Sequence, residues 1–353
     1  VLIGVQAVGL NFRDVLNVLG EYPGDPGPPG ADCAGTIIAT GAAGLHASGS
    51  AVFGLGHAPL ATVARAKALL LAPKALTLSF EEASTLPITW STTHVALQRA
   101  RLRKSHTLAV QAAAGGVGLK AIEYAHWLGV GVLGTAGRPQ KQQLLHSLGV
   151  RSLCSSRDGG VFAVGSAQLL RGGRMHGVLN SLSNDFIAAS LGALGEKGCF
   201  GEIGKRGIWS SGRVAASARR SQYEMIALDV DMARNLAWMH GVLELLSMRA
   251  LKRVARSLPL CSFDLEKHAH RAFRVLQHGL NIGKVVVRMA AKGDAEAGAR
   301  GSHLISGGAG GLGLLAARWL ATQGADGLAL ASRSGAVAAS MQSEWEQLRA
   351  RTT

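Results

Sequence analysis

The stretch Ala112-Ala-Ala-Gly-Gly-Val-Gly118 decides the fold of most of this chain, and a similar stretch, Gly307-Gly-Ala-Gly-Gly-Leu-Gly313, lies near its end. Each follows a short apolar run, Thr107 to Gln111 and His303 to Ser306, and precedes a helical pattern. Glycine lets the backbone turn sharply beside a pyrophosphate, and the N–H groups and dipole of the following helix attract negative charge. Two such turns between strand and helix predict dinucleotide binding, with one unit nearly whole and another barely begun.

The sequence around the first turn alternates between strand and helix patterns. The expected strands span 107–111, 130–135, 177–180 and 199–203, and the expected helices span 119–128, 140–148 and 184–194. Such alternation is typical of a parallel sheet covered by helices on both faces. Residues 1–90 instead show short strands and turns, with Ile3, Val5 and Ala7 on one face of the first strand. We therefore expect an α/β fold: a β-rich lobe, a Rossmann nucleotide-binding domain and the first αβ unit of a second Rossmann fold.

The composition indicates a globular protein with excess positive charge. Hydrophobic residues make up 48% of the 353 positions, and the formal net charge is +15. The basic residues are scattered and lack interleaved aromatic side chains, which favours a solvated surface over a nucleic-acid site. A positive field would still attract phosphorylated cofactors and acidic carrier proteins. No apolar run reaches the roughly eighteen residues that suggest a membrane span, so we expect none.

The cysteines bear on metal binding and location. Cys33, Cys154, Cys199 and Cys261 are far apart and form no cluster with metal-ligand spacing, so we expect no metal site. Free thiols are usual in a reducing compartment, and the expected location is cytoplasmic. Because the chain starts without Met and stops inside its second unit, we expect it to be part of a longer protein. An organellar location therefore stays open, since a targeting segment would lie upstream.

The residues after the second strand of the nucleotide-binding unit favour NADP(H) over NAD(H). An NAD site usually has an acidic side chain there, but this chain reads Thr135-Ala-Gly-Arg-Pro-Gln-Lys141. Arg138 and Lys141 would offer charge-assisted hydrogen bonds to a 2′-phosphate. The third strand ends in Ser155-Ser-Arg157, which adds Ser156 and Arg157 as candidate contacts. The simpler alternative is that these cations are exposed loop charges.

Several separated motifs resemble a known family. In order, they are Asn11-Phe-Arg-Asp-Val15, Glu21-Tyr-Pro-Gly24, Ala113-Ala-Gly-Gly-Val-Gly118, Leu179-Asn-Ser-Leu182 and Glu202-Ile-Gly-Lys205. Their order and spacing resemble the enoylreductase domains of type I polyketide and animal-type fatty acid synthases, which are zinc-free medium-chain dehydrogenases/reductases. The resemblance covers about residues 1 to 290. The tail, with its second glycine turn and Ser332-Arg-Ser-Gly335, looks like the opening of the ketoreductase domain that follows in these synthases.

The resemblance implies a domain organisation. Residues 1–92 and 233–290 would form a GroES-like substrate-binding lobe, truncated at its N-terminus, and residues 93–232 would form the Rossmann domain that binds NADPH. Residues 291–301 would be a linker, and residues 302–353 would begin the ketoreductase. The catalytic residues of that ketoreductase would lie beyond Thr353.

The resemblance also implies a reaction. Hydride passes from NADPH to the β-carbon of a trans-2-enoyl thioester on an acyl carrier protein, and a proton then reaches the α-carbon. Lys205 matches the lysine of the family's Glu-Ile-Gly-Lys element, and Asp229 matches the acid that would orient it. Tyr22 lies where the family may carry a tyrosine proton donor that fixes the configuration of an α-substituent. The catalytic candidates are therefore Lys205, Asp229 and Tyr22.

The same comparison yields a set of cofactor contacts. For the first unit these are Asn11, Thr92, Ala114, Gly115, Gly116, Val117, Gly118, Thr135, Arg138, Lys141, Ser156, Arg157, Asn180 and Lys284. For the second nucleotide turn they are Gly307, Gly308, Gly310, Gly311, Gly313, Arg333 and Ser334. Arg13 and Asp14 are expected to form a buried structural pair. One departure is Asp32, which stands where the family usually has a longer glutamate.

Two other functions compete with this interpretation. A free-standing quinone or enone reductase of the same superfamily would share the glycine turn, but the ketoreductase-like tail argues against it. A catalytically degenerate module, kept for scaffold geometry, is disfavoured by the presence of Lys205, Asp229 and Tyr22. The expected partners are an acyl carrier protein with a phosphopantetheine-linked enoyl chain, the neighbouring synthase domains and, by resemblance, a second copy in a homodimer.

Overall fold

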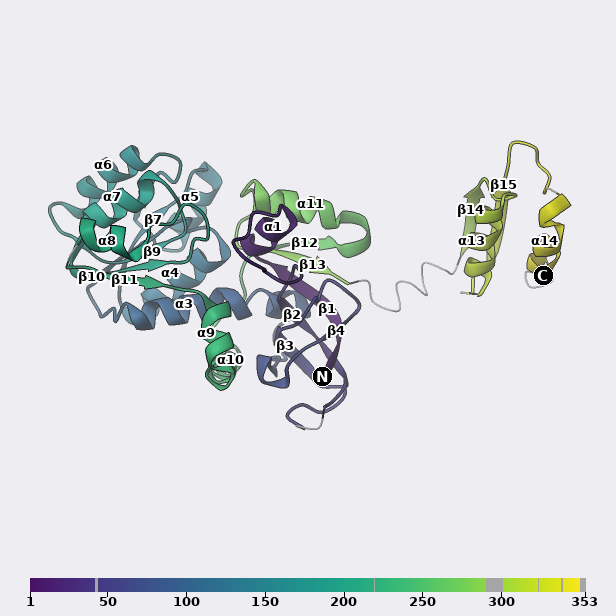
Figure 1. Ribbon diagram of the computed structural model, residues 1–353, viewed down its shortest axis with the longest axis horizontal. Helices are drawn as coiled ribbons and strands as arrows, with labels where there is room; N and C mark the ends of the chain where they lie inside the picture. Colours follow the sequence, from purple (N-terminus) through teal and green to yellow (C-terminus); the bar gives the residue numbers. More distant parts are fainter. Residues whose placement is uncertain (42–43, 219, 290–300, 323, 338, 350–353) are drawn as a thin grey trace. The chain divides into compact units, whose positions relative to one another are not determined.

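The computed structural model describes residues 1–41, 44–218, 220–289, 301–322, 324–337 and 339–349. These residues belong to two compact units, Val1–Met289 and Ala290–Thr353 (Figure 1). Apart from Gly301, the linker expected over 291–301 lies outside the described residues. No described helix is long and apolar enough to span a membrane.

The first sheet of unit 1 is mainly antiparallel. Its path is β12-β13-β1-β2-β3-β5, and β4 pairs with β1. The strands are β1 (Leu2–Leu10), β2 (Asp32–Ala39), β3 (Ala51–Leu55), β4 (Val63–Arg65), β5 (Leu71–Pro73), β12 (Leu260–Asp264) and β13 (Lys284–Arg288). Ile3, Val5 and Ala7 are buried on β1, as predicted from their alternation. β13 returns to pair with β1, with Leu10 opposite Val285, and so completes the lobe.

Four of the described helices belong to the same lobe as this sheet. They are α1 (Phe12–Val18), η1 (Ala68–Leu70), α2 (Phe80–Ser84) and α11 (Leu265–Gln277). Asn11 caps α1, and its N–H donates to the carboxylate of Asp14, 2.7 Å away. Because α1 directly follows β1, the cap places Asn11 at the end of a buried strand.

The second sheet of unit 1 is parallel, with the order β11-β10-β9-β6-β7-β8. Its strands are β6 (Thr107–Val110), β7 (Gly131–Thr135), β8 (Ser152–Cys154), β9 (Met175–Asn180), β10 (Leu194–Glu202) and β11 (Gln222–Met225). The helices are α3 (Pro87–Arg99), α4 (Gly116–Leu128), α5 (Pro139–Ser147), α6 (Gly159–Leu170), α7 (Asp185–Ala193), α8 (Ser211–Ser217), α9 (Leu228–Arg234) and α10 (Leu236–Leu251). Helix α4 covers one face of the sheet and α6 and α7 cover the other (Figure 1), which confirms the predicted α/β architecture, whereas α10 packs against β5 of the lobe.

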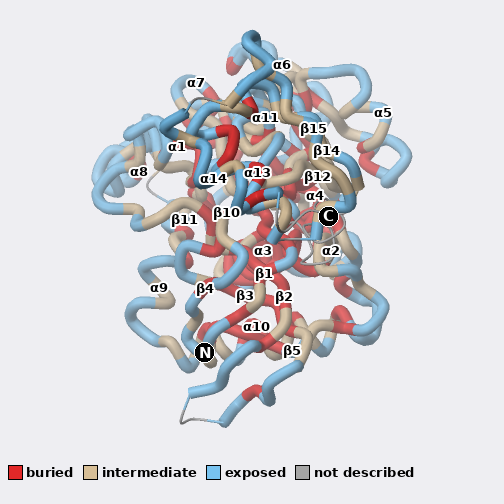
Figure 2. Tube along the Cα trace, turned by 90° about the vertical axis from the view of Figure 1, so that its right-hand side faces the viewer, coloured by how far each residue is buried: buried red, intermediate tan, exposed pale blue. Residues whose placement is uncertain are grey.

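Alternate side chains of β6 explain how both faces are filled. Leu108 and Val110 join the core that includes α3 and α4, whereas Ala109 packs with Phe162 and Phe186 of α6 and α7. The first of these cores is continuous with the antiparallel sheet and also contains Phe53 of β3. Figure 2 shows the central strands mostly buried and the outer helices largely exposed. One continuous core therefore fixes the lobe against the nucleotide-binding sheet.

Unit 2 contains one strand-turn-helix unit followed by a parallel strand. Its elements are β14 (Ser302–Ser306), α13 (Gly311–Thr322), β15 (Gly327–Ala331), η2 (Ala339–Met341) and α14 (Gln342–Arg349). Gly307 has a φ of +70°, which favours glycine. A Cβ on Gly313 would lie 2.4 Å from the Gly307 carbonyl oxygen. The turn can therefore close tightly because both positions lack a side chain.

Candidate active site

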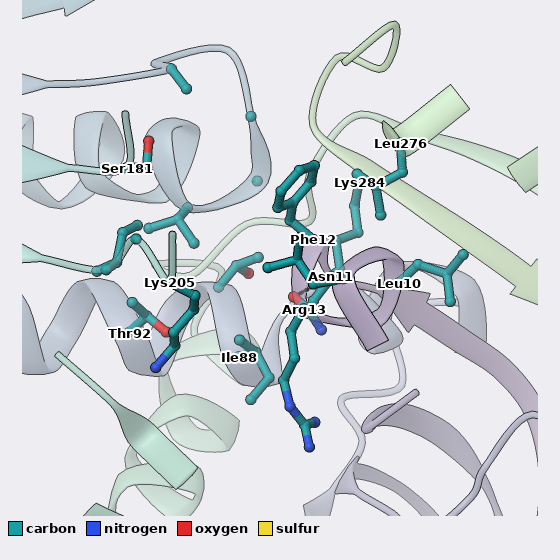
Figure 3. A pocket seen from close by; sticks show the side chains of 18 of the residues that line it. Leu10, Asn11, Phe12, Arg13, Ile88, Thr92, Ser181, Lys205, Leu276 and Lys284 are labelled. Carbon is teal, nitrogen blue, oxygen red and sulfur yellow. Dashed lines mark hydrogen bonds between the residues drawn. The ribbon is translucent and has the colours of Figure 1, made fainter. Parts of the chain in front are cut away.

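A cavity of about 990 Å³ lies where the parallel sheet meets the β-rich lobe. This is near the upper end of the usual range for small-molecule sites. Every residue of unit 1 predicted to act in catalysis or cofactor binding lines it, with one exception, Asn180. In Figure 3, Lys205 and Thr92 lie on the side of the parallel sheet, and Asn11, Phe12 and Arg13 come from the lobe.

The glycine turn forms one wall of the cavity. Gly115 caps α4, and a Cβ on Gly118 would lie 2.6 Å from the carbonyl oxygen of Ala113, so the backbone there leaves no room for a side chain. The Thr135 hydroxyl accepts from the Ala112 N–H at 3.0 Å and donates to Gln111 Oε1 at 2.9 Å. Thr135 is fully buried, so its hydroxyl braces the turn. These features fit a pyrophosphate held at the start of α4.

The residues predicted to bind a 2′-phosphate follow β7 and β8: Arg138 caps α5, Lys141 lies in its first turn, and Ser156 and Arg157 lie on the loop after β8. Arg138, Lys141, Ser156 and Arg157 all line the cavity. Lys141 donates to the Gly279 carbonyl at 2.9 Å, and burial together with nearby Arg138 lowers the pKa of its ammonium group. Within the part of the chain that the structure describes, no carboxylate forms an ion pair with Arg138, Lys141 or Arg157. This end of the cavity therefore fits an anionic ligand.

Lys205, Asp229 and Tyr22 come together at another wall of the cavity. The Lys205 ammonium lies 3.9 Å from Asp229 Oδ1, and the Tyr22 hydroxyl donates to Asp229 Oδ2 at 3.0 Å. Burial alone would raise the pKa of Asp229, but Lys205 and the Tyr22 hydroxyl outweigh it and hold this pKa below its usual value. Burial and the Asp229 charge raise the pKa of Tyr22. At neutral pH, an ionised carboxylate therefore lies between the Lys205 side chain and a protonated phenol.

Comparison with known proteins identifies the family. The crystal structure of the CurK enoyl reductase is 34% identical to this chain, with a TM-score of 0.76, and the alignment covers 82% of this chain and 91% of CurK. A component of the phenolphthiocerol/phthiocerol polyketide synthase of Mycobacterium tuberculosis is 33% identical over 350 residues. This chain belongs to the enoyl reductases of polyketide synthases. The predicted family is confirmed for the polyketide synthases; membership of the fatty acid synthases is not shown.

Two further matches complete the comparison. The JamJ enoyl reductase, solved in its apo form, has a TM-score of 0.77 at 28% identity and is covered over 90% of its chain, with 82% of this chain aligned. The KR domain family matches residues 301–353, which confirms that the tail of this enoyl reductase chain resembles a ketoreductase. The M. tuberculosis alignment covers 94% of this chain but 16% of that synthase component. The chain thus spans about a sixth of the length of this relative.

A buried polar network joins the lobe of the enoyl reductase to the cavity. The Lys284 ammonium lies 2.7 Å from Asp32 Oδ2 and 2.6 Å from Asn11 Oδ1, and Asn11 Nδ2 donates to the same Asp32 oxygen at 2.9 Å. Asp32 Oδ1 accepts from the Ile88 N–H at 2.8 Å. The shorter acid at position 32 therefore still reaches its partners. Asn11 and Lys284 line the cavity, but their side chains are already engaged in this network.

The expected pairing of Arg13 with Asp14 is wrong. Asp14 is buried and accepts backbone N–H groups from Asn11 and Gly30, whereas the Arg13 guanidinium donates to the Pro26 carbonyl and lies 5.6 Å from the centroid of the Tyr22 ring. Neighbouring helical residues point in directions about 100° apart, so adjacency in α1 does not bring the two side chains together. Arg13 instead packs on the loop that carries Tyr22.

A second contact ties that loop to the parallel sheet. Arg206, which follows Lys205, donates to the carboxylate of Glu21, which precedes Tyr22. The Arg206 guanidinium also lies 5.6 Å from the centroid of the Phe12 ring. Glu21–Arg206 and Tyr22–Asp229 are thus parallel contacts between the same two regions. Neither Arg206 nor Phe12 was among the predicted site residues, although Phe12 belongs to a quoted motif and Arg206 directly follows another.

The structure contradicts the predicted contact between Asn180 and the cofactor. Asn180 is fully buried and lies outside the cavity lining, although its neighbours Leu179 and Ser181 line it. Alternation at the end of β9 turns the Asn180 side chain away from the cavity. Its Nδ2 donates to the Leu182 carbonyl at 2.7 Å and to Glu202 Oε2 at 2.8 Å. Within the Leu179-Asn-Ser-Leu182 motif, Asn180 therefore links the end of β9 to Glu202 at the end of β10.

In unit 2, the second nucleotide turn lies between β14 and α13, and Arg333 and Ser334 follow β15. A Cβ on Gly308 would lie 2.7 Å from the Leu330 Cβ, so this glycine allows close packing of the turn on β15. Ser334 Oγ donates to the Ala336 carbonyl at 3.1 Å. The binding of a nucleotide to these residues stays a prediction.

Proposed function

We propose that this chain catalyses the NADPH-dependent reduction of the trans-2 double bond of an enoyl thioester carried by an acyl carrier protein. The observation that carries the proposal is the bridging position of Asp229 between Lys205 and Tyr22, in the cavity that also contains the glycine turn. A glycine wall, three cations that form no ion pair with a carboxylate of the described residues, and two proton-bearing side chains suit this reaction.

The residues present fit NADPH. Gly118 lets α4 pack closely on the backbone of Ala112 and Ala113, which presents the start of α4 to a pyrophosphate, and Arg138, Lys141 and Arg157 offer donors to a 2′-phosphate. When bound, NADPH would supply the hydride that reaches the β-carbon of the substrate. The glycine turn would hold the cofactor, and the apolar side chains of Phe12 and Ile88 would help exclude water from the cavity.

The proton-bearing side chains would complete the reduction. As the β-carbon gains hydride, the π electrons of the double bond move toward the thioester and leave an enolate. The Lys205 ammonium would stabilise the enolate oxygen or donate a proton to the α-carbon, and the Tyr22 hydroxyl is the other candidate donor. Asp229 would orient both groups and favour the protonated state of Tyr22. The product is a saturated thioester.

The test is NADPH oxidation with a trans-2-enoyl pantetheine thioester. Lys205→Ala should lower kcat about a hundredfold, which is the scale of general-acid or oxyanion contributions. The matched control is Lys267→Ala, because Lys267 is an exposed lysine of α11 and lies outside the cavity. Equal rates for both variants would contradict the proposed role of Lys205.

Tyr22→Phe separates the two proton donors. The enzyme is assayed in heavy water with a substrate that carries an α-methyl group. If Tyr22 is the donor, the product of this variant should no longer have a single configuration at its α-carbon. Retained configuration would assign the proton to Lys205. Faster turnover of free quinones than of the thioester would favour the quinone-reductase alternative, and NADPH binding without any turnover would favour a degenerate module.

The partners follow from the same proposal. An acyl carrier protein would deliver the thioester, and the net charge of +15 would attract an acidic carrier. Relatives such as the M. tuberculosis synthase component are far longer than this chain, which supports neighbouring synthase domains. The homodimer rests on the family resemblance, and sedimentation equilibrium of the enzyme would test it.

A further inference from the structure

Glu202 is a buried carboxylate directly behind the loop that carries Lys205. Its side chain is fully buried at the end of β10. Glu202 Oε1 accepts from the Gly204 N–H at 2.6 Å, and Oε2 accepts from Asn180 Nδ2 at 2.8 Å. A Cβ on Gly204 would lie 2.7 Å from Oε1, so glycine is what lets the carboxylate fit beneath the turn. The residue that directly precedes Lys205 is thus held by a hydrogen bond to Glu202.

The orientation of the Asn180 amide determines whether it donates a hydrogen bond to Glu202 or accepts one from it. Its Nδ2 also donates to the Leu182 carbonyl at 2.7 Å, whereas its Oδ1 is buried without a partner in the described structure. Reversing the amide would place two oxygens against each other at Leu182, so Nδ2 must face Glu202. Both groups that meet the carboxylate are therefore donors. An ionised carboxylate accepts both, but a protonated one would turn its own O–H toward a donor and lose a hydrogen bond.

We propose that Glu202 is a positioning residue: its ionised carboxylate, oriented by Asn180, holds the turn at Gly204 and so aims Lys205 at Asp229 and the substrate. The proposal rests on the proposed enoyl reduction, because it assigns Lys205 a task that depends on its position. Glu202 does not line the cavity and acts through Lys205. Protonation of Glu202 would release one anchor of the loop and lower the rate.

The surroundings of Glu202 put this switch near neutral pH. Burial raises the pKa of Glu202 to about 7, against the lowering effects of Asn180, the Gly204 N–H and the Lys205 charge. On the neighbouring strand β11, burial and the Glu202 charge raise the pKa of Tyr223 to about 12, so this phenol stays neutral. The pKa of Asp229 is held low and that of Tyr22 is raised, so neither would titrate in the same range.

The test compares kcat against pH at saturating NADPH for three enzymes. The wild type should lose activity below about pH 7, where Glu202 becomes protonated. The Gln side chain in Glu202→Gln cannot accept hydrogen bonds from both Asn180 Nδ2 and the Gly204 N–H, so kcat at pH 8 should fall about ten- to a hundredfold. The fall of kcat at acidic pH, the acidic limb of the profile, should also vanish in this variant. NADPH affinity should stay within about twofold, since Glu202 lies outside the cavity. The matched control, Glu224→Gln on β11, should keep the wild-type kcat at pH 8 and the wild-type acidic limb.

Asn180→Asp provides a second variant of nearly the same shape. A second carboxylate beside Glu202 disfavours its ionisation, so the acidic limb should move to higher pH. The proposal is overturned if Glu202→Gln retains the wild-type limb, if its NADPH affinity falls in parallel with kcat, or if Asn180→Asp leaves the limb unmoved. The first outcome assigns the titration elsewhere, and the second indicates a general loss of structure.

An NMR titration keeps this proposal separate from the proposed function. Labelling with isoleucine carrying ¹³C at the carbonyl and ¹⁵N-glycine selects the Ile-Gly peptides, which occur at Gly4, Gly204 and Gly283. The Gly204 amide should shift with an apparent pKa of about 7 in the wild type and not in Glu202→Gln, with the other two as internal references. If the wild type reduces no enoyl thioester, the proposed function fails, and a Gly204 amide that does not respond to pH would separately refute the coupling of Glu202 to the loop.

Discussion

Lys284→Met isolates the contribution of the buried ion pair that joins β13 to β2. The Lys284 and Asp32 side chains are 4% and 0% exposed, and their charged atoms lie 2.7 Å apart. Methionine retains most of the length and apolar character of lysine, so the variant removes the charge with little loss of packing. Asp32 would keep its hydrogen bonds from Ile88 N and Asn11 Nδ2 but lose its cation.

The expected cost follows from the burial of the remaining charge. Removing one partner of a buried pair costs about 3–5 kcal/mol of unfolding free energy, because the other charge stays desolvated. The double variant Lys284→Met/Asp32→Asn removes that charge. The new amide oxygen can still accept from Ile88 N, and Asn11 can reverse its amide so that its oxygen meets the new Nδ2. We therefore expect the double variant to regain about 2 kcal/mol of the loss.

Urea unfolding followed through Trp90 would measure these differences. Trp90 is 2% exposed and lies in α3, whose backbone at Ile88 is bonded to Asp32. Labelling with 5-fluorotryptophan and recording ¹⁹F spectra distinguishes this residue from Trp319 and Trp345 of unit 2. A single variant that loses less than about 1 kcal/mol, or a double variant less stable than the single one, would refute the argument.

Three shorter predictions concern the cofactor and Glu202. Gly118→Ala should weaken NADPH binding at least about tenfold in a fluorescence titration, because its Cβ would lie 2.6 Å from the Ala113 oxygen; unchanged affinity would show that the turn can relax. Arg138→Gln/Lys141→Gln should raise the Kd for NADPH about ten- to a hundredfold and leave NADH unaffected, and equal weakening of both would argue against a 2′-phosphate site. Because the pKa of Glu202 is raised from 4.5 to about 7, its contribution to wild-type stability is present below pH 4.5 and is lost as pH rises through 7. The loss amounts to about 3 kcal/mol, so urea unfolding should show a flatter pH dependence in Glu202→Gln, and parallel curves would count against the buried charge.

Much of the fold could be predicted because its signals are local. The strand before Ala112 and the helix after Gly115 are adjacent in sequence, and the alternation of Ile3, Val5 and Ala7 requires no knowledge of their partners. Helix α6 was missed for the same reason, and strand β8 was expected only through its end at Ser155. The strand has three residues, and the helix is rich in glycine and small side chains, so neither produces a strong periodic pattern.

The side-chain partners within the site could not be derived in this way. Asn180 belongs to a motif beside the cavity, yet the direction of its side chain depends on the pleat at the end of β9 and on Glu202, which is 22 residues away. Asp32 finds Lys284 at a separation of 252 residues. The meeting of Lys205, Asp229 and Tyr22 was anticipated through family resemblance, since no local pattern connects these residues. Their catalytic roles stay predictions.

The two borders of the cavity explain why the active site needs both sheets of unit 1. On one border the Gly283 N–H donates to the Ala114 carbonyl at 2.9 Å, and Lys284, the next residue, pairs with Asp32 in the lobe. On the other, Tyr22 from the lobe contacts Asp229. Separating the lobe from the parallel sheet would therefore disturb the glycine turn and the proton-bearing groups together. A substrate that contacts both the lobe and the parallel sheet would hold cofactor, ammonium and phenol in alignment together, which is how binding energy can be converted into catalytic alignment.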